Sequence, residues 1–239
     1  MKVLDLTLPT PAENLACDEA LLDCAEAGRG GETLRFWESP VPFVVVGHAN
    51  KVATEVNVAA CQTRGIPILR RCSGGGAVVQ GPGCLNYALI LQINTTGPLA
   101  NISTTNRFIM ERNQIALEIA LNRPVYMSGH TDLSAGARKF SGNSQRRRRN
   151  FLLFHGSILL KLDIKLVGEL LQMPTHQPEY RQNRTHEEFI INLHRPADRI
   201  KNAIRTAWRA TEGTASTPTE DIARLVAEKY SQRDWNFKF

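Results

Sequence analysis

The chain has 239 residues, of which 42% are hydrophobic, and its formal net charge is +6 at pH 7. This length can bury the core of one large domain or of two small ones. No apolar run reaches the roughly 18 residues of a membrane span, and the N-terminal residues lack the charged segment, apolar core and cleavage site of a signal peptide. We therefore expect a cytoplasmic protein without a membrane partner.

Much of the positive charge lies in the run Arg146-Arg147-Arg148-Arg149. Such a run is typical of a solvated loop, but it could also contact nucleotide phosphates, dock an acidic partner protein or bind nucleic acid. The sequence has no zinc-finger spacing and no aromatic-rich RNA-binding signature, and only 7% of its residues are aromatic. We expect a phosphate or an acidic partner, and no nucleic acid.

The five cysteines are odd in number, fall within the first 84 residues and form no C-x-x-C pair: Cys17, Cys24, Cys61, Cys72 and Cys84. This distribution argues against a disulfide framework and against a zinc site. We expect reduced thiols.

Two capping boxes, Thr10-Pro11-Ala12-Glu13 and Thr217-Pro218-Thr219-Glu220, mark the starts of the first and last expected helices. In chain order, the hydrophobic pattern predicts a strand at 2–6, a helix from the first box to about Gly28, strands at 33–37 and 43–46, a helix at 55–64 closed by Gly65, strands at 66–70, 77–80 and 85–93, a helix at 107–121, strands at 125–128, 138–141 and 151–162, and helices at 198–210 and 220–231. The arginine run separates the last two strands, which are expected to form a hairpin.

Strands that mostly follow one another directly, with few helices between them, favour an α+β fold over a regular βαβ repeat. No linker divides the sequence. We expect a single domain over residues 1–239, with a core at about 30–200 and C-terminal helices within 198–231.

The first block of polar residues is Arg70-Arg71-Cys72-Ser73-Gly74-Gly75-Gly76-Ala77, between two expected strands. Consecutive glycines let the backbone approach a ligand closely, exposed amides donate to a phosphate or carboxylate, and arginines add bidentate donors. The block is not a P-loop, because G-K-[ST] is missing, and it is not a dinucleotide fingerprint either. Asn86 follows a tight turn at 81–83 and could orient a polar part of the ligand.

The second block spans Gly129 to Ser157 and contains Asp132, Lys139 and His155. Lys139 precedes a Ser-Gly turn between apolar residues and could stabilise negative charge on a carboxylate or phosphate; otherwise it is a solvated strand lysine. Asp132 could hold a metal ion or the lysine, or cap a loop. His155 could donate to a ligand-binding group or be a buried, satisfied core residue.

At these residues the sequence resembles the lipoate–protein ligases of the biotin/lipoate ligase superfamily. The order and spacing of the matching motifs agree over most of the chain. They are Asn14-Leu15-Ala16-x-Asp18-Glu19-Ala20-Leu21-Leu22, Arg70-Arg71-x-Ser73-Gly74-Gly75-Gly76-Ala77-Val78, Gly129-x-x-Asp132-Leu133, Arg138-Lys139-x-Ser141-Gly142, His155-Gly156-Ser157-Ile158-Leu159 and Gln177-Pro178-Glu179-Tyr180-Arg181.

The resemblance implies a central mixed, largely antiparallel sheet flanked by helices, similar to class II aminoacyl-tRNA synthetases and biotin synthetase. It implies that lipoate and Mg·ATP form lipoyl-AMP, and that the lipoyl group then passes to a lysine of a lipoyl domain of a 2-oxoacid dehydrogenase or of the glycine-cleavage H protein. Lys139 would be the catalytic lysine, and Asp132 could hold Mg. Lipoate or the adenylate would be bound by Arg71, Ser73, Gly74, Gly75, Gly76, Val78, Asn86, Asp132, Phe140, Ser141, Gly142, Asn143, His155 and Gly156.

Two alternatives stay open. The chain has Gln80-Gly81 and Thr131 where the family often has His-Asp and Asn, which leaves an octanoyl- or lipoyl-transferase acting without ATP, or a non-catalytic lipoyl-binding or assembly protein. Such transferases use a nucleophilic cysteine near or beyond the lysine motif, but no cysteine follows Cys84. The small accessory domain of two-domain ligases has no counterpart here, so a separate accessory subunit is a candidate partner.

Overall fold

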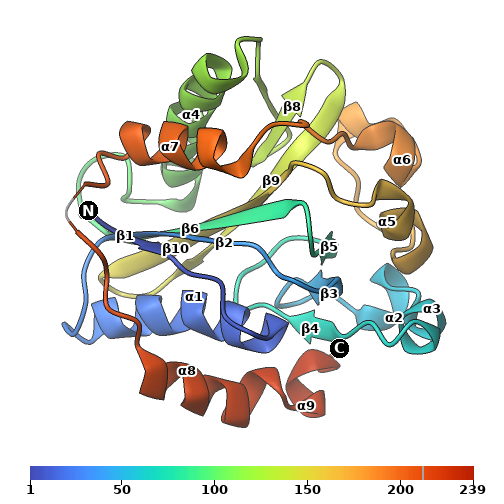
Figure 1. Cartoon of the computed structure of the whole chain (residues 1–239), viewed down its shortest axis with the longest axis horizontal. Coiled ribbons are helices and arrows are strands. Elements are labelled where there is room, and N and C mark those ends of the chain that lie inside the picture. The colour runs from blue at the N-terminus through green and yellow to red at the C-terminus, as the bar shows by residue number, and fades with distance from the viewer. Residues whose placement is uncertain (212) are drawn as a thin grey trace.

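The computed structural model describes residues 1–211 and 213–239. A large sheet with the strand order β1-β2-β6-β10-β9-β8-β7 crosses the molecule (Figure 1). Only the β1–β2 pair is parallel, and every other neighbouring pair is antiparallel. Its strands are β1 (Lys2–Asp5), β2 (Thr33–Trp37), β6 (Cys84–Gln92), β7 (Tyr126–Ser128), β8 (Asp132–Ala135), β9 (Arg138–Arg147) and β10 (Phe151–Leu159).

Helices cover both faces of this sheet. On one face α4 (Ile102–Leu121) and α7 (Ala197–Ala207) pack over a core that includes Leu89 and Phe154. On the other face lies α1 (Pro11–Glu26), which is itself covered by α8 (Thr219–Leu225) and is therefore buried on nearly all sides (Figure 1).

A small sheet with the order β4-β3-β5 lies beside the α1 face of the large sheet (Figure 1). Its strands are β3 (Phe43–Val46), β4 (Ile68–Arg70) and β5 (Val78–Gln80). A third apolar cluster joins this sheet to short helices. The remaining helical segments are α2 (Val52–Glu55), α3 (Val58–Thr63), α5 (Ile164–Leu170), η1 (Glu179–Arg181), α6 (His186–Phe189), the π-helical turn η2 (Val226–Tyr230) and α9 (Arg233–Asn236).

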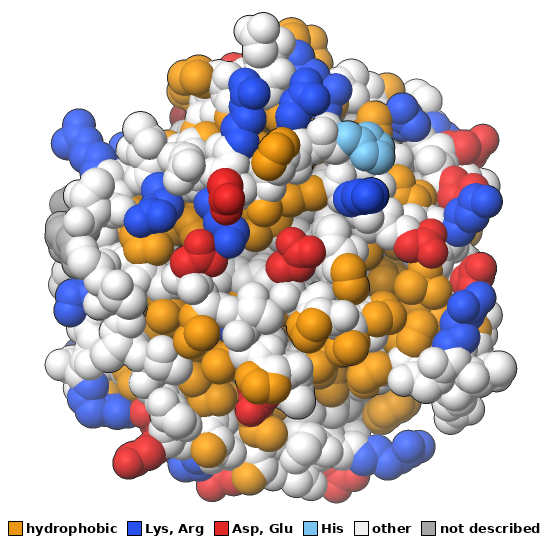
Figure 2. Space-filling model, in the orientation of Figure 1, with side chains coloured by type: hydrophobic (Ala, Val, Ile, Leu, Met, Phe, Trp, Pro, Cys, Tyr) orange, Lys and Arg blue, Asp and Glu red, His pale blue; other side chains and the backbone are white. Residues whose placement is uncertain are grey.

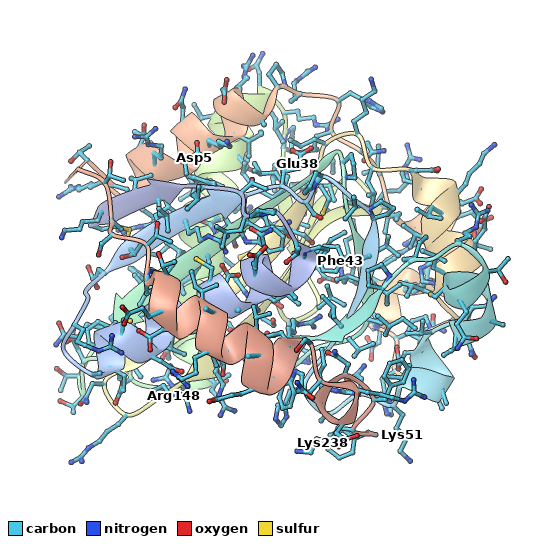
Figure 3. The ribbon with its side chains drawn as sticks, turned by 60° about the horizontal axis from the view of Figure 1, so that its bottom comes forward. Asp5, Glu38, Phe43, Lys51, Arg148 and Lys238 are labelled. Carbon is cyan, nitrogen blue, oxygen red and sulfur yellow. The ribbon has the colours of Figure 1, made fainter. Side chains whose placement is uncertain are left out.

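The C-terminal segment returns to the small sheet. The Val52 amide donates to the Phe239 carbonyl at 3.1 Å, and Lys51 and Lys238 lie close together in Figure 3. The Arg70 backbone amide donates to the Asn236 side chain at 2.9 Å. The strand that leads into the glycine-rich block is therefore held by the end of the chain.

The α+β class and the mixed, largely antiparallel sheet flanked by helices are confirmed. So is the first capping box, because the Thr10 hydroxyl accepts from the Glu13 amide and the Glu13 carboxylate accepts from the Thr10 amide. The second box is wrong. Helix α8 begins at Thr219 with Pro218 as its N-cap, and proline has no side-chain acceptor for the helix amides.

Several element boundaries also differ from expectation, and three of these differences have a clear local cause. The helix expected at 55–64 is two short helices, because Val56 is extended and pairs with Leu171 in a β-bridge, and Asn57 caps the second helix. Helix α4 starts at Ile102 rather than 107, since the Asn101 side chain accepts from the Thr104 amide. Strand β9 continues to Arg147, so half of the arginine run belongs to the sheet.

The face in Figure 2 carries Lys and Arg side chains interspersed with Asp and Glu. Among the described residues, no helix has the length and apolar character needed to cross a membrane.

Candidate functional site

The glycine-rich block forms a loop between β4 and β5 that lies against the turn after β3. A Cβ on Gly47 would be 1.9 Å from the Gly75 carbonyl oxygen, and the His48 amide donates to the Ser73 carbonyl at 2.8 Å. Gly75 has a φ of +89°, which disfavours a side chain there. Glycine at 47 and 75 thus allows two backbone segments to touch and fixes the loop in place.

Both arginines of the block support backbone rather than face an open site. The Arg71 guanidinium donates to the Gly74 carbonyl at 2.6 and 3.1 Å and to the Gly76 carbonyl at 2.9 Å. Burial lowers the pKa of Arg71 to about 10. Arg70 likewise donates to five backbone carbonyls, those of Gly47, His48, Asn50, Trp235 and Asn236. The expected positive charge is therefore present, but it lies under the loop and orients its carbonyls.

With the carbonyls held by Arg71, the loop amides remain available. Within the described residues, the Gly74, Gly75 and Gly76 amides donate no hydrogen bond. A Cβ added to Gly74 or Gly76 would meet no atom within 4 Å, so open space lies beside both. Successive free amides of this kind form an anion-binding concavity.

Behind the loop runs a line of buried polar groups. The Ser73 hydroxyl is 2.5 Å from His155 Nε2, and His155 Nδ1 is 3.1 Å from an Asp18 carboxylate oxygen. The other Asp18 oxygen accepts from Arg35 at 2.5 Å. Ser73 and His155 were expected at the site, whereas Asp18 was noted only as part of a motif and Arg35 was missed. In the sequence, both residues stand out only as charges among apolar neighbours. In the structure, these positions in α1 and in strand β2 are fully buried.

The charges in this line are compensated. Burial raises the pKa of Asp18, but the charge of Arg35 and the hydrogen bond from His155 outweigh it and hold the pKa below its usual value. Asp18 is therefore a carboxylate that can only accept, so His155 donates through Nδ1.

A second polar group surrounds Lys139. Its ammonium is 2.8 Å from Asp132 Oδ1, and the Tyr180 hydroxyl donates to Asp132 Oδ2 at 2.7 Å. Burial and the neighbouring Asp132 charge raise the pKa of Tyr180 well above its usual value, so it remains a donor. A Cβ on Gly142 would be 2.8 Å from Lys139 Nζ, which means that Gly142 leaves the space that the ammonium occupies.

A β-bulge brings Lys139 to this face. The pairs Leu133↔Ser141 and Ser134↔Lys139 leave Phe140 as the extra residue of β9. Phe140 is fully buried in the core beneath α4 and α7. Bulges commonly re-aim a side chain beside an active site. Phe140 thus acts by shaping the strand, while the neighbouring Lys139 reaches over Gly142.

Three polar groups form a row along β9, which we call the β9 row: Lys139 over Gly142, then Ser144, then Arg146. Alternate residues of a strand share a face, so Gly142 and Arg146 are separated by about 13 Å along it. Ser144 contacts the glycine-rich loop, because its hydroxyl is 2.7 Å from that of Ser73. The middle of the row therefore contacts the glycine-rich loop, whose amides at Gly74, Gly75 and Gly76 are free.

Arg146 has the clearest unmet binding capacity in the row. Its Nε is buried, and it has no hydrogen-bond or ion-pair partner within the part of the chain that the structure describes. Burial, and next the Arg146 charge, lower the pKa of His48, which places this guanidinium near the turn that holds the loop. Sequence reasoning placed Arg146 only in an undifferentiated basic run.

Arg147 and Arg148 of that run are structural. Arg147 donates to Thr105 at 3.1 Å and to the Leu99 carbonyl at 2.8 Å, whereas Arg148 donates to Asp23 at 2.7 and 3.0 Å. The solvated-loop interpretation is thus wrong for both, and of the four only Arg149 is exposed.

Asn143 and Gly156 lie on the opposite face of the sheet. Asn143 accepts from the Tyr87 hydroxyl at 2.5 Å and donates to the Thr131 carbonyl at 2.7 Å. Its side chain crosses Gly156, where a Cβ would be 1.7 Å from Asn143 Oδ1. Tyr87 also accepts from Asn113 at 2.9 Å, so this network ties β9 to α4. In this structure Asn143 and Gly156 brace the site from behind.

Asn86 and Val78 lie on the inner side, between the two sheets. Asn86 is buried and paired across strands with Trp37, and Val78 packs at the edge of the α1 cluster. Asn86 Oδ1, Trp37 Nε1 and Gln80 Oε1 are all buried and have no hydrogen-bond partner among the described residues. Ser141 is buried within β9. Buried polar atoms without a partner are rare in proteins, so these three make the inner side a candidate surface for polar contacts to a ligand.

The chain offers no activated thiol. All five cysteines are buried and free. Burial raises the pKa of Cys17, Cys72 and Cys84 to about 12, and it also raises the pKa of Cys24 and Cys61. A protonated buried thiol is a poor nucleophile.

The described residues contain no group of three or more His, Cys, Asp or Glu side chains that could hold a metal ion. Asp132, the expected Mg ligand, has one oxygen on Lys139 and the other on Tyr180. Both oxygens of Asp132 are therefore engaged, and one of them holds the Lys139 ammonium in place.

Comparisons with known proteins agree with this geometry. The sequence pattern of the lipoyl protein ligase A/B catalytic domain matches residues 10–204. The octanoyltransferase LipM of Exiguobacterium sibiricum is 26% identical, over 99% of this chain and 98% of that protein. Lipoate-protein ligase A subunit 1 of Thermoplasma acidophilum is also 26% identical, over 97% of this chain and 95% of that protein.

Solved structures share the fold. A lipoate-protein ligase A bound with ATP superimposes with a TM-score of 0.85 at 22% identity, covering 99% of this chain and 98% of that one. A putative lipoate protein ligase from T. acidophilum with bound lipoic acid gives 0.84 at 22% identity, covering 100% and 99%. Because the family pattern spans most of its length, this chain belongs to the lipoyl protein ligase A/B catalytic domain family.

Proposed function

We propose that the chain is an ATP-dependent lipoate–protein ligase, which activates lipoate as lipoyl-AMP and transfers the lipoyl group to a lysine of an acceptor protein. The observation that carries the proposal is that the β9 row, which contains Lys139 and Arg146, contacts through Ser144 the loop whose Gly74, Gly75 and Gly76 amides are free. One wall presents cations and the other presents amide donors, so an anion between them is held from both sides.

In the first step a lipoate carboxylate oxygen attacks the α-phosphorus of ATP, and pyrophosphate leaves. Both reactants are anionic, so their approach needs positive charge. Lys139, aimed by Asp132 and Tyr180, would neutralise the carboxylate and the α-phosphate together. Arg146 and the loop amides would bind the remaining phosphate oxygens. The fixed positions of these donors reduce the reorganisation needed at the transition state.

In the second step the acceptor lysine amine attacks the activated carbonyl, and AMP leaves. The loop amides would stabilise the negative charge that develops on the carbonyl oxygen. Thiol chemistry is not needed in either step, which accords with the buried cysteines and their raised pKa values.

The residues fit ATP through these anion donors, but they do not form a protein cage for Mg. Mg usually keeps several waters and is held by phosphates with one or two carboxylates. Within this proposal Mg would enter with ATP and neutralise its phosphates, and Asp132 is the carboxylate closest to Lys139 that could share that role.

The proposed acceptors are lipoyl domains of 2-oxoacid dehydrogenases and the glycine-cleavage H protein. Support for the first comes from an archaeal bi-partite lipoate protein ligase studied with its E2 lipoyl domain, which shares the fold with a TM-score of 0.84. The same bi-partite relative supports a separate accessory subunit. We place the reaction in the cytoplasm.

An octanoyltransferase is the second candidate, favoured by LipM relatives that match nearly the whole chain. It would move the acyl group from a carrier protein without ATP. Cysteine chemistry does not suit this chain, for the reasons given above, so we rank this function second. A non-catalytic lipoyl-binding role ranks third. A scaffold protein does not need a lysine oriented by Asp132, or an arginine such as Arg146 that is left without a partner.

The test is lipoyl-AMP formation without an acceptor protein. We expect the wild-type chain with lipoate and Mg·ATP to release pyrophosphate and accumulate lipoyl-AMP, and Lys139→Ala to lower this rate about 100- to 1,000-fold. Lys165→Ala, an exposed lysine on α5, is the matched control and should keep the rate. Equal rates for Lys139→Ala and the wild type, with equal unfolding temperatures, would refute the role of Lys139.

A further inference from the structure

A groove of about 780 Å³ runs between α4 and α7, which lie side by side over one face of the large sheet (Figure 1). We call it the α4–α7 groove. Its floor consists of the alanines Ala116, Ala120, Ala203 and Ala207. Ile115 and Ile119 of α4 also line it, and their side chains are 58% and 75% exposed. Adjoining large apolar side chains that face solvent mark an interaction surface.

The alanine floor has the shape that a third helix needs. Residues four apart lie on the same face of a helix, so each helix presents a pair of alanines to the groove. Such small residues keep the floor low, and larger side chains of a neighbouring helix can then fill it. The lining on α4 extends from Phe108 to Ala120, which is about 18 Å along the helix axis. The groove therefore accommodates about three turns of a helix.

The rim of the groove is cationic and lacks matching acids. Arg112 and Arg199 line it, and within residues 1–211 and 213–239 neither guanidinium forms an ion pair. Arg112 is held in place by the Trp208 ring, whose centroid is 4.9 Å from its Cζ. Among the lining residues of the described chain, the only acid is Glu111, which is already paired with Arg107 at 3.4 Å. Carboxylates on an occupant would complete the charge of this rim.

We propose that the α4–α7 groove docks an amphipathic helix of a separate protein. Large apolar side chains of that helix point toward the alanine floor, and its Asp or Glu residues point toward Arg112 and Arg199. In this mode of recognition, apolar anchors at helical spacing enter a groove, and the flanking charges select the partner. The groove and α1 lie on opposite faces of the large sheet, so the partner leaves the glycine-rich loop uncovered. The inference goes beyond the ligase reaction and does not depend on it.

Two other occupants fit the groove less well. A two-fold interface pairs a surface with itself, so a second copy of the chain would bring Arg112 and Arg199 against the same arginines. An anionic membrane would suit the charge of the rim, but a flat lipid surface does not fill a concave groove, whereas interfacial helices insert a convex apolar face. Charge and shape together favour the acidic helix.

The experiment uses a synthetic helical peptide of about 18 residues, with leucines at i, i+3, i+4 and i+7 and glutamates on both flanks. A second peptide has lysine in place of every glutamate. Each is titrated against the whole chain at about 0.1 M salt and followed by fluorescence anisotropy. We expect the glutamate peptide to bind at least about tenfold more tightly than the lysine peptide.

Substitutions on the two helices locate the binding. Ile115→Asp should weaken the glutamate peptide about tenfold or more, because it places a charge beside the apolar floor. Ile102→Asp is its matched control, since Ile102 is also 58% exposed on α4 but lies outside the groove. Arg199→Glu should weaken the glutamate peptide and strengthen the lysine peptide. Arg205→Glu, at an exposed position of α7 outside the groove, should change neither affinity.

Equal affinities of the two peptides, or equal effects of Ile115→Asp and Ile102→Asp, would overturn the proposal. Sedimentation velocity of the chain alone, and cosedimentation with vesicles of phosphatidylcholine and phosphatidylglycerol, test the other occupants. A dimer that Ile115→Asp dissociates would assign the groove to a second copy, and vesicle binding that Ile115→Asp abolishes would assign it to lipid. Either result would overturn the helix. A monomer whose α4 and α7 gain protection from hydrogen exchange with the glutamate peptide supports it.

Discussion

At the scale of single residues, most charged side chains of the site form ion pairs, and one, Arg146, has no partner among the described residues. Asp18 and Arg35 satisfy each other deep in the core, and Lys139 is paired with Asp132. Arg146 has no partner among the described residues although its Nε is buried. Leaving a partly buried cation unpaired destabilises a fold, so such a group indicates a site for an anionic ligand.

Arg146→Met should therefore separate activity from stability. We expect lipoyl-AMP formation to fall at least tenfold, because a donor to the substrate anion is lost, while the unfolding temperature stays equal or rises. Thermal unfolding and the pyrophosphate-release rate are measured on the same samples. Arg149→Met, at the exposed end of the same run, is the control and should change neither quantity. A large loss of stability in Arg146→Met would mean that the residue is structural.

The lowered pKa of Asp18 predicts that the free energy of unfolding depends on pH. Its pKa is lowered in the folded chain, so its ionised form contributes stability above about pH 4, and this contribution is lost as the pH falls through the lowered folded value. Asp18→Asn leaves Arg35 buried without its charge partner and should lose about 3–5 kcal/mol of unfolding free energy at pH 7.

Denaturant unfolding at pH 7 and at pH 2–4 measures this. We expect the gap between Asp18→Asn and the wild type to narrow in acid, because the wild-type carboxylate becomes neutral there. A gap that is the same at every pH would contradict the pairing.

Individual site residues were predictable where the sequence carries a local signal. Consecutive glycines, Lys139 before Ser-Gly, and Asp132 were found this way, although the Ser-Gly pair lies within strand β9 and not in the expected turn. The Asp18–His155 contact joins residues separated by 137 positions, and Ser73–His155 joins residues separated by 82. No local pattern encodes such contacts. A charged residue in an apolar strand, such as Arg35, nevertheless indicates that a buried polar partner lies elsewhere in the chain.

At the scale of elements, long apolar segments were predicted and short mixed ones were not. β6 and β10 have strong hydrophobic patterns and α1 starts with a capping box, so all three were found, whereas β8 and α6 have only four residues each. Strand β9 was cut short because its second half, Gly142–Arg147, is polar. That half is polar because it carries the β9 row on one face and bonds to α4 on the other.

The β9–β10 hairpin provides an element-scale prediction. Arg148 lies at the hairpin beside α1 and donates two hydrogen bonds to Asp23, with Glu19 at 3.8 Å (Figure 3). Because the side chain is about one-third exposed, we expect Arg148→Ala to lose only about 0.5–1.5 kcal/mol of unfolding free energy. Arg149→Ala should lose almost none. Equal effects of the two substitutions in denaturant unfolding would rule out this docking contact.

At the scale of the whole molecule, two sheets and α1 converge on the glycine-rich loop. The small sheet supplies the loop, the large sheet supplies the β9 row, and α1 supplies Asp18. The α+β class followed from the order of strands and helices, but the meeting of these three layers depends on tertiary packing. The C-terminal segment also belongs to the site's support, since it anchors Arg70.

The most direct test of the central claim is the mass of a purified lipoyl domain after incubation with this chain, lipoate and Mg·ATP, beside a reaction without ATP. The account predicts one lipoyl group on the acceptor lysine only when ATP is present, and none with Lys139→Ala. An unmodified lipoyl domain in the complete reaction, with no lipoyl-AMP formed, would contradict the account.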